Sequence, residues 1–181
     1  MSLVNVSANG ASLQKTSGCA GCPDASAVSE QQISGDGVVE FTVSDSSMLL
    51  VVGLGAGGIG SGAADINFAM RLQGGVAEVR ESGAYRSEIG FAAGDIFRIA
   101  VERGVVRYSN NGAVFYTSAS QAAFGVRVHA VFFDLNATIS NVSIQSALTG
   151  ASSVPGVAGA TTQLRYAQPR PAGSVPVRRR R

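Results

Sequence analysis

Hydrophobic and polar residues alternate over most of the first 147 residues, in short runs separated by Gly, Asn, Asp or Ser. Phe97, Ile99 and Val101, for example, are spaced two residues apart, with a polar or small residue between them. Because successive side chains of a strand point to opposite faces, this period predicts β-strands with one buried face. The pattern predicts strands at Leu3–Ser7, Ala11–Thr16, Val38–Val43, Met48–Leu54, Ala64–Leu72, Val76–Glu81, Asp95–Arg103, Val105–Ser109, Ala113–Ser118, Gly125–Phe132 and Ala137–Gln145.

Turn residues join several of these strands. Asn111-Gly112 lies between two predicted strands and supplies the positive φ angles of a tight hairpin, and Arg103-Gly104 is a weaker signal of the same kind. Residues 95–118 should therefore form a three-stranded meander. A change of phase near Ser140–Asn141 predicts a β-bulge. No long run has helical spacing, so the predicted fold is all-β, an antiparallel two-sheet jelly-roll sandwich.

The charge of the chain is divided unevenly. Of 14 basic and 12 acidic side chains, all 12 acids but only eight of the basic residues precede Leu148. The first 147 residues therefore have a formal charge of −4, and residues 148–181 have one of +6. The second segment also holds four of the five prolines, and its composition offers too little apolar surface to fold. We predict a recognition domain at residues 1–147 and a disordered basic tail at residues 148–181.

A glycine-rich motif follows the apolar run that begins at Met48. Gly53, Gly55 and Gly58 match the spacing G-x-G-x-x-G, which in a dinucleotide-binding fold brings a pyrophosphate to the N-terminus of a helix. The next segment, Ala64–Leu72, has the alternation of a strand, and no βαβ pattern surrounds the motif. The motif is specific only in that context, so we interpret it as a loop between strands and predict no cofactor.

Cys19 and Cys22 are the only cysteines, and His129 is the only histidine. A zinc site would need two further ligands, and a thioredoxin-like motif would open a helix within a βαβ unit. The pattern offers neither, so we predict no metal site. The two cysteines form either a disulfide that closes a loop in an oxidising compartment or a pair of free thiols.

Groups that could carry catalysis are sparse. A glycosidase built on a sandwich needs two carboxylates about 5–10 Å apart. Glu78 and Glu81 are three residues apart and so face opposite sides of a strand, and Asp65 has no acidic residue two positions away. No G-x-S-x-G motif marks a serine nucleophile. We therefore predict that the protein is not an enzyme.

Polar side chains on the outward faces of the strands indicate a binding surface instead. Planar amide, guanidinium and aromatic groups are those that sugar rings and hydroxyls, or a peptide backbone, would contact. We predict that neighbouring strands stack such groups into one polar platform, extended by an adjoining loop; the alternative is an ordinary solvated sheet face. The predicted ligand-binding residues are Asp65, Asn67, Arg71, Tyr85, Arg86, Arg98, Arg127 and His129.

The tail ends in Arg178, Arg179, Arg180 and Arg181, which would make at most weak, salt-dependent contacts with nucleic acid. A charge run alone is weak evidence, and the predicted folded domain is acidic, so nucleic acid is not a predicted partner. No apolar run is long enough to cross a membrane. The first ten residues lack the basic and apolar regions of a signal peptide.

A set of segments spread over the first 147 residues has a recognisable pattern. They are Ser7–Thr16, Ala27–Ile33, Gly35–Phe41, Asp65–Ala69 and, most specifically, Gly94-Asp-Ile-Phe-Arg-Ile99, followed by Asn111-Gly112 and Phe115-Tyr-Thr-Ser118. From about Val4 to Ile144, the chain resembles the concanavalin A-like, SPRY-reminiscent β-sandwich module of large bacterial surface or secreted proteins, including RHS-repeat proteins.

This resemblance implies a lectin-like, non-catalytic module that recognises carbohydrate at a cell surface. The alternative that it implies is a SPRY-like protein-interaction domain, or a structural spacer, within a larger surface or secreted protein. The expected partner is accordingly carbohydrate or a protein surface. The expected location, which follows from the same resemblance, is extracellular or at the cell surface.

Overall fold

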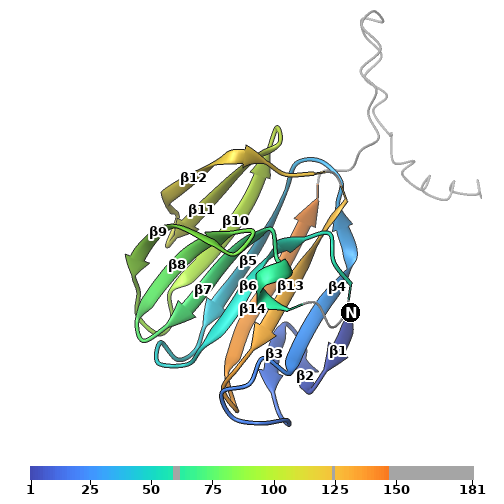
Figure 1. Ribbon diagram of the computed structural model, residues 1–181, viewed down its shortest axis with the longest axis vertical. Coiled ribbons are helices and arrows are strands. Elements are labelled where there is room, and N and C mark those ends of the chain that lie inside the picture. The colour runs from blue at the N-terminus through green and yellow to red at the C-terminus, as the bar shows by residue number, and fades with distance from the viewer. Residues whose placement is uncertain (59–61, 124, 147–181) are drawn as a thin grey trace, which may run out of the picture. The chain divides into compact units, whose positions relative to one another are not determined.

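Two antiparallel β-sheets form a sandwich in the computed structural model, which describes residues 1–58, 62–123 and 125–146 (Figure 1). The predicted all-β, two-sheet fold is confirmed. The predicted tail at residues 148–181, with Arg178–Arg181, lies outside the described residues. Within the described ranges, no helix is long and apolar enough to span a membrane.

Each sheet has seven strands, and strands that are distant in sequence become neighbours in space. The first sheet contains, in spatial order, β1 (Ser2–Val4), β4 (Ala25–Ile33), β13 (Val126–Phe132), β6 (Leu50–Gly55), β7 (Phe68–Gln73), β8 (Val76–Glu81) and β9 (Ala84–Gly90). The second sheet contains, in spatial order, β12 (Ala113–Gln121), β11 (Val105–Asn110), β10 (Ile96–Glu102), β5 (Gly37–Val43), β14 (Thr138–Ser146), β3 (Ser12–Lys15) and β2 (Val6–Asn9).

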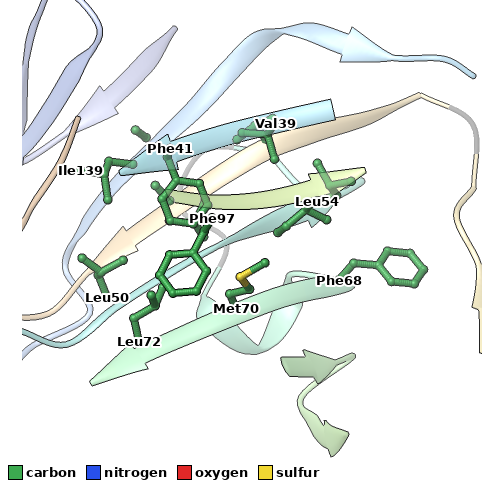
Figure 2. Close-up of a cluster of buried hydrophobic side chains, with 14 of the residues drawn as sticks. Val39, Phe41, Leu50, Leu54, Phe68, Met70, Leu72, Phe97 and Ile139 are labelled. Carbon is green, nitrogen blue, oxygen red and sulfur yellow. The ribbon is translucent and has the colours of Figure 1, made fainter. Parts of the chain in front are cut away.

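Apolar side chains from the inner faces of the two sheets form one core. Phe41 and Phe97 stack with their ring centroids 5.8 Å apart, and Phe91 packs edge-on against Phe97 at 5.3 Å. Burial of these inner-face side chains holds the two sheets together. Figure 2 shows side chains of this core, among them Val39, Phe41, Leu50, Leu54, Met70, Leu72, Phe97 and Ile139.

The predicted turns and bulge are present. The two φ angles at Asn111-Gly112 are 47° and 82°, and those at Arg103-Gly104 are 51° and 81°. Both dipeptides therefore close tight hairpins, and β10, β11 and β12 pair in succession as the predicted meander. The register of β14 on β5 shifts between Ser140 and Ser143, which confirms the bulge.

The first predicted strand, Leu3–Ser7, is two strands that belong to different sheets. Asn5 has a φ of 53°, in the left-handed region that asparagine tolerates better than most residues. The chain turns there, so β1 pairs with β4 in the first sheet and β2 pairs with β3 in the second. The beginning of the chain thus links the two sheets.

Two strands lack the alternation that predicts the others. Residues 25–29 of β4, which lies between β1 and β13, are buried on both faces. The other is the edge strand β9, in which most residues are exposed. The predicted strand Ala64–Leu72 also begins later than expected, at Phe68, because Ala63–Asp65 form the short 3-10 helix η1.

The glycine-rich motif lies partly in a strand. Gly53 and Gly55 belong to β6, which corrects the interpretation of the whole motif as a loop. A Cβ atom on Gly53 would lie 2.2 Å from the carbonyl oxygen of Phe68, so the close approach of β7 requires glycine there. In the described residues, only η1 separates β6 from β7, which differs from the strand–turn–helix of a dinucleotide site.

The single lysine of the chain is buried inside the sandwich. Lys15 shares its face of β3 with Leu13, so the period of the strand turns its side chain inward. Four oxygens surround the ammonium group and compensate for its loss of water. Lys15 Nζ lies 2.6 Å from Asp24 Oδ1 and 2.7, 2.9 and 2.8 Å from the carbonyl oxygens of Cys19, Cys22 and Phe133.

A disulfide between Cys19 and Cys22 closes the loop that surrounds this ammonium group. Two of the four oxygens are the carbonyls of these cysteines, so the disulfide and Lys15 hold the same loop. The hydrogen bonds that Asp24 accepts from Lys15 and from the backbone of Cys19 lower the pKa of its carboxyl group. Of the two alternatives for the cysteines, the structure contains the disulfide.

Replacing Lys15 with Met should lower the free energy of unfolding by about 3 kcal/mol, because buried carbonyl oxygens would lose their donor. Urea unfolding followed by circular dichroism would measure the change. Arg107→Met is the matched control, since Arg107 pairs with Glu102 at the surface and its loss should cost less than about 1 kcal/mol. Equal losses in the two variants would contradict the role of the buried ammonium group.

Candidate functional site

The predicted platform does not form as one surface, because its residues belong to both sheets. Arg71 is on β7, and Arg127 and His129 are on β13, all in the first sheet. Arg98 is on β10 of the second sheet, opposite Glu40 and Ser109. Alternation indicates which face of a strand is polar, but it does not assign the strand to a sheet. The expectation that Arg98 stacks with the others is therefore wrong.

The outer face of the first sheet is largely covered. Val51, Ala69 and Val131 point outward from β6, β7 and β13, and Ile66 packs on them as a second, small apolar cluster. Ile66 directly follows η1, which lies against this face (Figure 1). The covered area is thus unavailable as an open platform.

His129 is one of the residues covered in this way, with only 3% of its surface exposed. Gly53 is its partner on β6, and the backbones of Gly55 and Gly57 contact the imidazole ring. Burial lowers the pKa of His129, and the charge of Arg127 lowers it further. The residue therefore stays neutral in the folded protein at neutral pH and is not presented to a ligand.

Arg71 remains accessible but is held in a row of ion pairs. Arg71 Nη1 lies 3.4 Å from Glu78 Oε1, and Arg80 Nη2 lies 2.7 Å from Glu78 Oε2. These three side chains come from the adjacent strands β7 and β8. Partly exposed pairs of this kind contribute little to stability, and they occupy the charges that a ligand would need.

Asp65 and Asn67 do not lie on a strand. Asp65 ends η1, and its Oδ2 accepts a hydrogen bond from the backbone of Gly62 at 2.8 Å. Asn67 precedes β7, and its Oδ1 accepts a weak bond from the backbone of Ala56 at 3.4 Å. Tyr85 and Arg86, predicted on a loop, are on β9, where Tyr85 is 53% exposed.

Asn67 and Arg86 come together in a cavity of about 370 Å³, here named the end cavity. It lies where the first residues of β7 and β9 approach the last residues of β8 and β12. Phe68 and Val126 contribute apolar surface, and the other side chains are polar or small. The lining consists of Ala56, Asn67, Phe68, Glu81, Ser82, Arg86, Ser120, Gln121, Ala123 and Val126.

Glu81 is the acidic residue of the end cavity, and it points into the sandwich. The period of β8 places it on the same face as the buried Ala77 and Val79, and only 4% of its surface is exposed. Its Oε2 lies 3.3 Å from Arg86 Nε. The other oxygen, Oε1, is buried and has no hydrogen-bond partner. Glu78 faces the opposite side of β8, as predicted from the spacing.

Tyr108 of β11 faces Glu81 from the second sheet. Its side chain is fully buried, and its hydroxyl group is directed at the Glu81 carboxylate but makes no hydrogen bond of regular geometry. Burial raises the pKa of Tyr108 above its ordinary value, and the negative charge of Glu81 raises it further. The carboxylate of Glu81 thus lies between a phenol in the core and the Arg86 guanidinium at the cavity.

Sequence reasoning missed Glu81 as a site residue, although the pattern contains a signal. The alternation Ala77, Val79, Glu81 places an acid where a third core residue is expected. A buried acid without full pairing is unfavourable in a purely structural position, and such residues cluster at functional sites. Among the described residues, no group of three or more His, Cys, Asp or Glu side chains could hold a metal ion.

No protein-family model and no curated protein sequence matches this chain. Solved structures do match. A human SPRY domain matches with a TM-score of 0.60 at 14% sequence identity, and the match covers 77% of this chain and 96% of that domain. The SPRY domain of human HERC1 matches with a TM-score of 0.61 at 12% sequence identity, and the match covers 82% of this chain and 96% of that domain. The carbohydrate binding module CBM66 from Bacillus subtilis matches with a TM-score of 0.55 at 12% sequence identity, and the match covers 79% of this chain and 92% of that module.

These likenesses establish the fold. The chain has the jelly-roll sandwich shared by SPRY domains and by carbohydrate-binding modules of the concanavalin A-like type. At identities of 7–14%, ligands and partners do not transfer with the fold. The function must therefore be argued from the residues of this chain.

The stability of the protein should fall as the pH drops below about 6.5, the ordinary pKa of histidine. The pKa of the buried His129 is lowered, so the unfolded chain takes up a proton at a higher pH than the folded chain does. Urea midpoints at pH 7.5 and 5.5 would measure the loss. His129→Gln should abolish the difference, because the chain has no other histidine; an undiminished difference in this variant would contradict the assignment.

Proposed function

We propose that this protein is a non-catalytic binding module that holds a carbohydrate in the end cavity. The observation that carries the proposal is the composition of the cavity's lining. Asn67 and Gln121 supply amides, Ser82 and Ser120 supply hydroxyls, and Arg86 supplies a guanidinium group beside apolar surface. Sugars present hydroxyl groups and apolar C–H faces together, so this mixture is complementary to them.

The size of the end cavity is consistent with a small part of a glycan. Ligand pockets occupy about 300–1,000 Å³, and the end cavity, at about 370 Å³, lies at the lower limit of this range. It is suited to one terminal sugar rather than to a long internal stretch of polysaccharide. The presence of the same fold in a carbohydrate binding module supports the proposal at the level of architecture.

The lining of the end cavity favours binding over hydrolysis. Glycoside hydrolysis requires two carboxyl groups about 5–10 Å apart, and Glu81 is the single acidic side chain among the lining residues. Its partner Arg86 keeps this acid paired. The disulfide between Cys19 and Cys22 fits an oxidising compartment, which supports the proposal of an extracellular or cell-surface location.

A protein-interaction role is the second candidate, and the edge strands favour it. Tyr85 on β9 and Val114 on β12 are 53% and 54% exposed, and these strands form the edges of the two sheets. Edge strands present unpaired backbone groups to which an extended peptide can add. SPRY domains, which share this fold, are consistent with such a role.

A glycan array probed with the full chain should show saccharide binding that Asn67→Ala and Arg86→Ala weaken by about tenfold or more, because each variant removes a polar contact. Arg98→Ala is the control, since Arg98 lies on the second sheet outside the end cavity and its loss should leave binding unchanged. No binding across the array, or loss of binding only in Arg98→Ala, would refute the proposal. Binding of extended peptides to the edge strands β9 and β12, without binding of any saccharide, would favour the second candidate.

A further inference from the structure

The end cavity contains one positive and one negative side chain, and the two neutralise each other. Glu81 Oε2 pairs with Arg86 Nε, and the described lining includes no other charged residue. The Glu81 side chain is 5% exposed and the Arg86 side chain is 43% exposed. The carboxylate therefore lies deep in the cavity, and the guanidinium group lies nearer the solvent.

Arg86 retains donors for a ligand. Its ion pair uses Nε, and among the described residues neither terminal nitrogen of its guanidinium has a hydrogen-bond or ion-pair partner. Guanidinium groups with a free terminal fork usually recognise carboxylates and phosphates, because they match their geometry and charge. In this cavity, however, Glu81 already compensates the positive charge.

The burial of Glu81 is not explained by structural needs alone. The buried cation at the other end of the strands, Lys15, has four oxygens around it, whereas Glu81 has one ion pair and one oxygen without a partner. A buried oxygen without a partner destabilises a fold. An apolar residue that continued the row of Ala77 and Val79 would avoid this penalty, so the acid at this position calls for another role.

We propose that Glu81 makes the end cavity selective for neutral saccharides by cancelling the charge of Arg86. The proposal rests on the proposed carbohydrate-binding function and names its ligand class. Arg86 donates to ligand hydroxyl oxygens, as Asn67 and Gln121 can from the neighbouring walls. A uronic acid, sialic acid or sulfated sugar would place a second negative charge close to Glu81, and the single positive charge of Arg86 would then face two anions.

Substitution of Glu81 by Gln tests this role. The change keeps the shape of the side chain and removes its charge, which leaves Arg86 as an uncompensated cation in the cavity. The wild-type full chain should bind glycans ending in a neutral hexose at least about tenfold more tightly than glycans ending in the corresponding hexuronic acid. E81Q should lose or reverse this preference, as measured by calorimetric titration with both members of each pair.

Glu78→Gln is the matched control for E81Q. Glu78 is on the same strand but faces the opposite side, where it pairs with Arg71 and Arg80 outside the end cavity. E78Q should keep the wild-type preference for neutral glycans. If E81Q does not fold by circular dichroism, Arg86→Gln provides the test, because it leaves Glu81 unpaired and should disfavour acidic glycans by a further factor of about ten.

The outcomes separate this inference from the proposed function. A shift toward acidic glycans in E81Q but not in E78Q supports the role of Glu81. Equal affinity of the wild-type chain for neutral and acidic glycans, or an equal shift in both glutamine variants, overturns the role and leaves carbohydrate binding standing. Failure of the wild-type chain to bind either class overturns the proposed function itself.

Discussion

Exclusion of water from the space between the two sheets is the constraint on which the rest of the structure depends. Each strand turns every second side chain into that space, so a polar residue in phase with the core must find its partners there. Among the described residues, Lys15 and Glu81 are the two buried charged residues in this position. The two residues differ in how fully they are paired. Lys15 is enclosed by four oxygens, whereas Glu81 forms an ion pair with Arg86 through one carboxylate oxygen and has no hydrogen-bond partner for the other.

The strand β13 relates these two charges in space. Its last residue is followed by Phe133, whose carbonyl oxygen binds Lys15, and its first residue, Val126, lines the end cavity. One end of the sandwich is therefore closed by a disulfide and a buried ammonium group, and the other is open and incompletely paired. The two ends of the sandwich therefore differ in how fully their buried polar groups are paired.

The sequence predicts strands well where one face of the strand is buried and the other is wet, and it fails where both faces are alike. Alternation and Asn-Gly turns therefore predict the meander, whereas β4, buried on both faces over residues 25–29, and β9, in which most residues are exposed, give no signal. The prediction that Arg98 belongs to the platform was wrong, because the sheet to which a strand belongs depends on its pairing with strands distant in sequence. β10, which carries Arg98, pairs with β5 in the second sheet. His129 was misjudged because a tertiary contact, the segment before β7, covers an outward face. Asn67 and Arg86 do line one site, but it is a cavity that forms only when the sheets pack together.

The enclosure of Lys15 also determines how the protein can be modified. It is the one lysine of the chain, so every other basic side chain carries a guanidinium group or the imidazole of His129. Acylation and cross-linking of lysine need an accessible side-chain amine, and amine-reactive esters also react with the α-amine of Met1. The side-chain amine of Lys15 is held by Asp24 and three carbonyls, so its labelling would report that this end of the sandwich has opened.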